Sequence, residues 1–145
     1  MEKNVFEWIF YFFQIFWQLP QNLVGLVMLL WFMSQGKVSL VDKTKWSYAF
    51  VSKHMTGGIS LGMFCFVSEK LAKRPEGVAH ELKGHTWDSR LFGPLYLLII
   101  GLPSIMNAAI GFTKCYYSWY PEAWANKHAG LTVDEYCHLK FKDKQ

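Results

Sequence analysis

Two long stretches of the chain contain no charged residue, residues 8–36 and residues 91–113. Each exceeds the roughly 20 residues that a helix needs to cross a bilayer. Pro20 interrupts the first stretch, so residues 5–33 are predicted to form one apolar helix or a kinked helix pair. The second stretch is broken at residues 101–104 (Gly-Leu-Pro-Ser). This break leaves two predictions open for residues 91–113, a membrane helix or an apolar hairpin of two half-helices.

The segments between and after these stretches predict shorter elements. Two β-prone runs around a Gly-Gly pair predict a β-hairpin over residues 46–67. A helix is predicted over residues 78–90, because Gly77 ends the charged loop before it. Pro121 suits the first turn of another helix, over residues 120–131. At 145 residues, one domain is expected to hold all of these elements.

Four amide side chains interrupt the apolar pattern of the first stretch. They fall at spacings of four, three and one residues (Gln14, Gln18, Gln21, Asn22). We expect them to face protein rather than lipid, as polar contacts between helices.

The distribution of charge favours a membrane protein. The N-terminus lacks a basic segment and a small-residue cleavage site, so the first stretch is predicted to be a retained anchor. Nine of the 15 Lys and Arg residues lie at positions 37–90, and the positive-inside rule places that segment in the cytoplasm. The prediction is a mainly α integral membrane protein with a small β-hairpin, whose partner is the lipid bilayer. The alternative is a soluble domain with two buried core helices.

Net charge and cysteine content narrow the function classes. The net charge is +4, and no basic run interleaved with aromatic residues indicates a nucleic-acid surface, so no nucleic-acid partner is expected. The cysteines are widely spaced and odd in number (Cys65, Cys115, Cys137). They predict free thiols, with neither a disulfide framework nor a cysteine zinc site.

Candidate chemistry is concentrated at residues 80–85, which read His-Glu-Leu-Lys-Gly-His. In the H-E-x-x-H motif of zinc metallopeptidases, both histidines bind zinc from one helix face and the glutamate acts as general base. Here the histidines stand at i and i+5. On a regular helix i+5 lies roughly 140° from i, whereas i+4 lies roughly 40° away. The two imidazoles can share one ion only if a π-bulge widens the turn. Trp87 and Asp88 are interpreted as an interface anchor and a helix-surface charge.

Four stretches carry a resemblance that covers residues 17–131. They read WQLPQN at 17–22, GGISLG at 57–62, GHTWDS at 84–89 and GPLYL at 93–97. In this order they resemble the motifs of a family of uncharacterised small bacterial membrane proteins of the Bacteroidetes and Firmicutes type, which read roughly WQLPQN, GGxSLG, HEYGHxxQS and GPLYL. The resemblance implies the bacterial cytoplasmic membrane as the location and carries no established activity.

A looser resemblance is to the gluzincin zinc metallopeptidases, in which H-E-x-x-H is followed downstream by E-x-x-A-D. It implies zinc as the cofactor, with His80, His85 and Glu122 as metal ligands and Glu81 as the catalytic residue. Asn126 stands where the pattern has an orienting Asp, and it can accept the same hydrogen bond without bringing a charge. Both Asn126 and the extra residue between the histidines point toward lowered or lost activity.

This second resemblance implies a gluzincin-like core and a membrane-embedded zinc metallopeptidase-like hydrolase. Its substrate would be a peptide or a membrane protein, held by strand addition along the hairpin at residues 46–67. A shared metal requires Glu122 on the same side as His80, which favours the hairpin over the spanning helix for residues 91–113. The alternative function is a non-catalytic membrane scaffold or subunit that retains the fold without metal.

Overall fold

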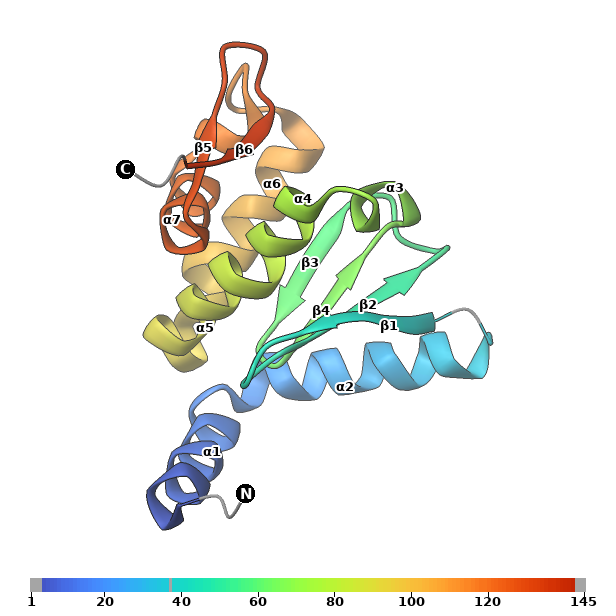
Figure 1. The fold of residues 1–145 in the computed structure, drawn as a ribbon, viewed down its shortest axis with the longest axis vertical. Coiled ribbons are helices and arrows are strands. Elements are labelled where there is room, and N and C mark those ends of the chain that lie inside the picture. Colours follow the sequence, from blue (N-terminus) through green and yellow to red (C-terminus); the bar gives the residue numbers. More distant parts are fainter. Residues whose placement is uncertain (1–3, 37, 143–145) are drawn as a thin grey trace.

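A four-stranded mixed sheet lies in the middle of the protein in the computed structural model, which describes residues 4–36 and 38–142 (Figure 1). The strands are β1 (Val38–Lys43), β2 (Tyr48–Ser52), β3 (Gly58–Leu61) and β4 (Phe64–Val67), in the order β1-β2-β4-β3. β2 and β4 pair parallel, whereas β1–β2 and β3–β4 pair antiparallel. β3 is therefore an edge strand, with one side of its backbone not paired to another strand.

The prediction of a simple β-hairpin over residues 46–67 is wrong, because this segment forms three strands. β4 lies between β2 and β3, so the loop at residues 53–57 joins strands that are not neighbours. The tight turn lies instead at Gly62–Met63, between β3 and β4. Gly62 has a φ of +67°, which glycine adopts without the steric cost that a side chain would bring.

Helices cover both faces of the sheet, and the alternation of side chains along β4 decides which helix each face meets. Phe66 packs against Phe32 of α2 (Leu19–Ser34). Cys65 points to the opposite face, where it packs with Val78 and Leu82. These two residues belong to one continuous helix made of α4 (Pro75–Ala79), the π-helical turn η1 (His80–His85) and α5 (Thr86–Phe92), which α3 (Glu69–Ala72) precedes. Burial on both faces explains the nearly unbroken apolar run of β4.

The first apolar stretch forms two helices, α1 (Val5–Trp17) and α2, which meet at an angle of 84°. The bend falls at Gln18, and Pro20 fits into the first turn of α2, where no hydrogen bond is lost. The expectation that the four amides face protein is confirmed, because all four are buried (Gln14, Gln18, Gln21, Asn22). Ser89 of α5 joins them, since it donates to Gln18 Oε1 at 2.7 Å and accepts from Gln21 Nε2 at 3.0 Å.

The second apolar stretch reverses direction earlier than predicted. Its bend of 119° lies at Tyr96, between η2 (Gly93–Leu95) and η3 (Leu97–Gly101), and not at residues 101–104. Gly93 takes a φ of +52° there, which suits a glycine. At the expected break, the π turn η3 continues into α6 (Leu102–Ile110), and Pro103 falls in the first turn of α6.

The prediction of a mainly α integral membrane protein with a gluzincin-like core is wrong as a description of the fold. Helices packed on a four-stranded mixed sheet, with a second, two-stranded sheet, form the described part of the chain. No single helix among residues 4–36 and 38–142 is both long and apolar enough to cross a membrane. The two bent pairs, residues 5–34 and 75–110, meet that criterion only when the helices of each pair are taken together. The sharp bends break each apolar stretch into shorter helices.

The C-terminal segment packs beside the long helix and is closed by a disulfide. It contains η4 (Tyr116–Ser118), α7 (Tyr120–Ala129), β5 (Leu131–Val133) and β6 (Leu139–Phe141), and the last two strands pair antiparallel. The prediction of three free thiols is wrong, because Cys115 and Cys137 form a disulfide. Folding of the β5–β6 hairpin brings them together across 22 residues, a proximity that their spacing does not reveal. Cys65 is free and buried.

Candidate metal centre

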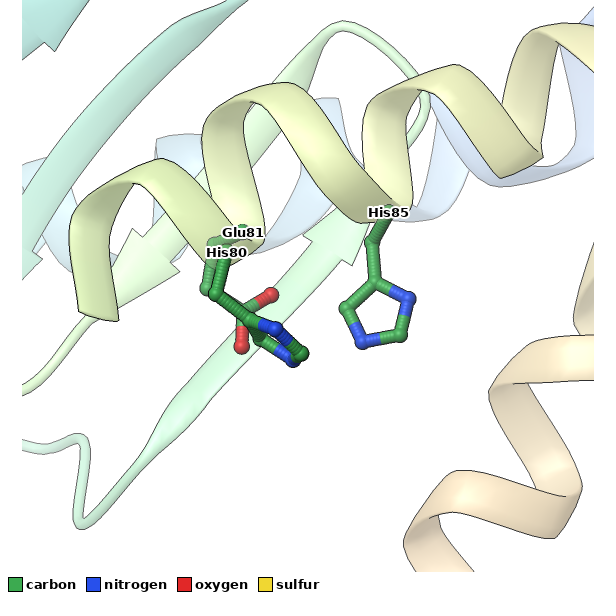
Figure 2. A group of neighbouring side chains, drawn as sticks. All are labelled: His80, Glu81 and His85. Atoms are coloured by element: carbon green, nitrogen blue, oxygen red, sulfur yellow. The ribbon is translucent and has the colours of Figure 1, made fainter. Parts of the chain in front are cut away.

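The widened turn η1 brings both histidines to one side of the helix. His80 and His85 begin and end this six-residue π-helical segment, and their ring centroids lie 4.8 Å apart. Figure 2 shows the side chains of His80, Glu81 and His85 extending from the same side of the helix. One ligand atom from each of the three lies within 4.8 Å of the others. The extra residue in the motif is therefore absorbed by i→i+5 hydrogen bonding, which places i and i+5 together.

Glu122 reaches the two histidines from α7. Its Oε2 atom lies 2.8 Å from His80 Nε2 and 3.1 Å from His85 Nε2. Gly84 permits this approach, because a Cβ atom at that position would lie 2.4 Å from the carbonyl oxygen of Ala125. The absence of a side chain at Gly84 thus lets α7 lie against η1 closely enough for a carboxylate to reach both imidazoles.

Asn126 fixes the orientation of His80. Its Nδ2 donates to the carbonyl oxygen of Tyr117 at 3.2 Å, so its Oδ1 is the atom that faces His80 Nδ1, at 2.7 Å. Since an amide oxygen only accepts, Nδ1 carries the proton of this hydrogen bond. In the neutral imidazole, Nε2 then presents a lone pair toward the Glu122 carboxylate. Two such atoms 2.8 Å apart require a proton or a metal cation between them.

The electrostatics of the centre are those of a buried ion cluster. Burial by itself would raise the pKa of Glu122, but the hydrogen bonds and charges of His80 and His85 outweigh burial and hold it well below its ordinary value. Burial by itself would lower the pKa of His85, but the carboxylates of Asp88 and Glu122 outweigh it and raise that pKa to about 10. Without metal, His85 is therefore a cation at neutral pH, and a bound metal ion would displace its proton.

Glu81 lies beside the histidines at the edge of the sheet. The Ser60 hydroxyl of β3 donates to Glu81 Oε2 at 2.6 Å, and the Tyr96 hydroxyl donates to the Ser60 carbonyl at 3.0 Å. Gly58 leaves room for the carboxylate, because a Cβ atom at that position would lie 2.3 Å from Glu81 Oε1. The hydrogen bond from Ser60 therefore joins the edge strand β3 to η1 at Glu81, which occupies the position of the general base in the H-E-x-x-H motif.

Two adjoining cavities, of about 270 and 540 Å³, form a cleft along β3. They share a set of lining residues, with the Glu81 carboxyl group among them (Gly58, Ile59, Glu81, Ala108, Tyr116). His85 lines the smaller cavity and His80 the larger. The histidine–carboxylate cluster therefore opens on a cleft between the edge strand and α6, a geometry that can hold an extended chain.

The donor set fits a zinc ion. Two imidazole nitrogens and a carboxylate oxygen are common zinc ligands, and in a tetrahedral site with bonds of about 2.0–2.1 Å neighbouring ligand atoms lie roughly 3.3 Å apart. The observed separations of 2.8 and 3.1 Å between Glu122 Oε2 and the two Nε2 atoms are a few tenths of an ångström shorter. A small outward movement of the three side chains would admit the ion.

Several polar residues around the centre were not singled out by the sequence. The Ser104 hydroxyl donates to Glu122 Oε1 and lies 2.9 Å from the hydroxyl of Tyr116. The interpretation of Asp88 as a helix-surface charge is wrong, because its side chain is fully buried and bonded to His128. Ser60 lies within the GGISLG stretch and could have been found there. No local pattern distinguishes a buried Asp88 from an exposed one, because its burial depends on α7.

Comparisons with models of protein families, with curated proteins and with solved structures give no match. The resemblance to small bacterial membrane proteins therefore stays a prediction.

Proposed function

We propose that this protein is a zinc-dependent hydrolase that cleaves peptide bonds, with His80, His85 and Glu122 as the metal ligands. One observation carries the proposal: Glu122 Oε2 lies within 3.1 Å of Nε2 of both histidines, while Glu81 lies beside them on the cleft. A zinc ion held there would supply a Lewis acid and a bound water of lowered pKa.

Glu81 is the residue proposed for proton transfer. Its carboxylate lines the cleft and is oriented by the Ser60 hydroxyl, so it can take a proton from an attacking water and return it to the leaving amine. Glu122 is poorly suited to that task, because it is fully buried and both of its oxygens are already hydrogen-bonded.

The proposed substrate is an extended segment of chain that lies along β3. It would belong to a free peptide or to a membrane protein. An edge strand offers backbone groups to a further strand, and the apolar side chains of the cleft can accept alternate side chains of the peptide. Leu97, Leu102 and Ile105 contribute to the smaller cavity, next to Glu81 and His85. This arrangement would place a backbone carbonyl of the peptide beside the proposed metal centre.

Metal analysis of the purified protein tests the proposal. After loading with zinc and desalting, we expect about one zinc ion per chain, and loss of the ion in His85→Ala and Glu122→Gln. His138→Ala is the matched control, because His138 is exposed and lies in the β5–β6 hairpin. Glu81→Gln should keep the zinc and abolish cleavage of a mixed peptide substrate. A wild-type protein that retains no more zinc than His85→Ala would overturn the proposal.

A second candidate function is a non-catalytic scaffold that keeps this fold without metal. It is favoured by the completeness of the hydrogen bonding around Glu122, whose Oε2 contacts both imidazoles and whose Oε1 accepts from Ser104. Metal analysis and the cleavage assay together separate the two candidates. A scaffold would retain no zinc, would fold equally well in the presence of a chelator and would show no cleavage.

We also propose that α1 and α2 contact lipid, at the bacterial cytoplasmic membrane. Residues 8–36 carry no charge, yet many of their large apolar side chains are exposed, among them Phe12 at 66 % and Val27 at 67 %. Trp8 and Trp31 are also exposed, and tryptophan is typical of the lipid–water interface. A predominantly apolar surface of this kind, on two successive helices, fits the chemistry of a bilayer.

Flotation with liposomes tests lipid contact. We expect wild-type protein to float and the triple variant Phe6→Ser, Ile9→Ser, Phe13→Ser to float less, because these residues lie on one side of α1 and are exposed. The matched control is Tyr136→Ser with Phe141→Ser, two exposed aromatic residues of the C-terminal segment. If the wild type instead stays with the aqueous fraction and forms a dimer that the triple variant lacks, the surface binds a second copy and the lipid proposal is wrong.

A further inference from the structure

A second carboxylate lies behind His85, on the side away from Glu122. Asp88 is fully buried, and its Oδ2 lies 3.5 Å from His85 Nδ1. Its other oxygen, Oδ1, is 2.8 Å from Nδ1 of His128, a residue of α7. His85 therefore has one carboxylate near each of its ring nitrogens, Glu122 at Nε2 and Asp88 at Nδ1.

Two atoms in the group formed by His85, Asp88 and His128 lack hydrogen-bond partners among the described residues. They are His85 Nδ1 and Asp88 Oδ2, both buried, and they face each other at 3.5 Å. That separation suits an ion pair but is longer than a regular hydrogen bond. Leaving a buried donor and a buried charged acceptor unpaired is costly, so a small rotation that joins them would be favourable.

We propose that Asp88, held in place by His128, is a positioning residue that orients His85 for metal binding. The inference rests on the proposed zinc site. An Asp88 carboxylate that accepts from Nδ1–H leaves the lone pair of His85 on Nε2, the nitrogen that faces Glu122 Oε2. A negative charge at Nδ1 also makes the imidazole a stronger ligand.

The two histidines have matching arrangements, which supports this assignment. His80 Nδ1 has an oxygen acceptor at 2.7 Å from Asn126, and His85 Nδ1 has one within reach from Asp88. Each imidazole thus directs Nε2 to the same oxygen of Glu122. The acceptor for His80 is the neutral amide of Asn126, whereas the acceptor for His85 is the charged carboxylate of Asp88.

His128 connects this support to α7, the helix that also supplies Glu122. α7 therefore contacts His85 directly through Glu122 and indirectly through His128 and Asp88. The side chain of His128 is 27 % exposed, and a glutamine there keeps an N–H donor for Asp88, so His128→Gln is expected to fold. His128 is expected to act by holding Asp88 Oδ1, which leaves Oδ2 directed at His85.

Zinc affinity and the visible spectrum of the cobalt-loaded protein test the inference. We expect Asp88→Asn to weaken zinc binding by about 10–100-fold in competition with a chromophoric chelator, and to shift the cobalt absorption bands. His128→Gln should weaken binding in the same direction by a smaller factor. His138→Gln is the control, because the side chain of His138 is exposed and pairs with Asp134, which is not a residue of the proposed centre. Thermal unfolding of each metal-free variant shows whether its fold is intact.

The outcomes separate this inference from the proposed function. Zinc binding by the wild type with an unchanged affinity and cobalt spectrum in Asp88→Asn overturns the inference and leaves the zinc site standing. A wild type that binds no zinc overturns both. If Asp88→Asn does not fold, His128→Gln decides: weaker zinc binding at an unchanged unfolding temperature supports the inference, and unchanged binding overturns it.

Discussion

Buried polar side chains make up the candidate metal centre at the scale of single residues. His80, His85, Asp88 and Glu122 are all buried, and a buried charge is costly unless it is paired and hydrogen-bonded. Here each of them has an oppositely charged or hydrogen-bonding neighbour within 3.5 Å. Removing one partner would leave the others uncompensated, so these residues depend on one another.

Substitution of Gly58 should separate the proposed catalysis from the proposed metal binding. In Gly58→Ala the new Cβ would lie 2.3 Å from Glu81 Oε1, so Glu81 must move. We expect the free energy of unfolding to fall by about 1–3 kcal/mol. Peptide turnover should fall by about 10²–10⁴-fold. Zinc affinity should change little, because Glu81 is not a proposed ligand.

The neighbouring Gly57 provides the control for this prediction. A Cβ at Gly57 meets nothing within 4 Å, so Gly57→Ala should keep both stability and turnover. Urea denaturation and a peptide-cleavage assay measure the two effects. Equal behaviour of the two variants would show that Glu81 has room to move at no cost.

The π turn is the decisive feature at the scale of secondary structure. Along a regular helix the two histidines would diverge by roughly 140°, and only the widened turn lets both reach Glu122. Lys83 is the exposed residue within this turn, so it is the position at which one residue can be removed without disturbing the core. After such a deletion α5 would still present the same residues to the core, because a π turn is equivalent to one residue inserted into a regular helix.

Deletion of Lys83 should therefore restore an i, i+4 spacing and convert the turn to regular helix. We expect the protein to fold and its zinc affinity to hold or rise, as measured by chelator competition. Lys83→Ala keeps the wide turn and should bind zinc like the wild type. A deletion variant that keeps its helical circular dichroism but loses zinc would show that the wide turn itself is needed.

At the scale of the whole molecule, segments far apart in the chain meet at one place. Glu122 lies 42 residues after His80, and Ser60 lies 21 residues before Glu81. The sheet, the histidine helix and α7 must all be in position before the cluster exists. The Cys115–Cys137 disulfide encloses α7, so it restricts the helix that brings Glu122 to the histidines.

Removing this disulfide should destabilise the whole fold. For a closed loop of 22 residues, the loss of loop entropy corresponds to about 3 kcal/mol in the free energy of unfolding. We expect that decrease in the double variant Cys115→Ser, Cys137→Ser, measured by urea denaturation. A reductant should destabilise the wild type by the same amount and leave the double variant unchanged. Identical midpoints for the oxidised wild type and the double variant would contradict the prediction.

Local patterns were informative where the structure depends on neighbouring residues. The spacing of His80 and His85 indicates that a regular helix cannot bring them together, and the structure has a π turn at that position. Pro20 interrupts the first apolar stretch and lies next to its bend. The buried amides of α1 and α2 were recognisable because they interrupt an apolar stretch. Each of these features follows from backbone preferences or helical geometry over a few residues.

Local sequence patterns gave wrong predictions where the structure depends on which helices and strands pack against one another. The apolar stretches were read as parts of an integral membrane fold, because composition alone does not show that α2 covers one face of a sheet. The residues at 46–67 read as a hairpin, because the parallel pairing of β2 with β4 leaves no local signal. Asp88 read as a surface charge, and Cys115 and Cys137 as free thiols, for the same reason.

The sequence by itself therefore placed the candidate residues His80, Glu81 and His85 in one short segment, and it required a widened turn if both histidines are to share one ion. The gluzincin resemblance added Glu122 and Asn126 as expectations, but only the tertiary structure decided that these two, together with Asp88 and Ser60, surround that segment. The physical reason is that hydrogen-bond geometry within a helix is set by adjacent residues. The meeting of η1 and α7 depends instead on side-chain volume at positions such as Gly84, where a Cβ atom would lie 2.4 Å from the carbonyl oxygen of Ala125 and would keep the two helices apart.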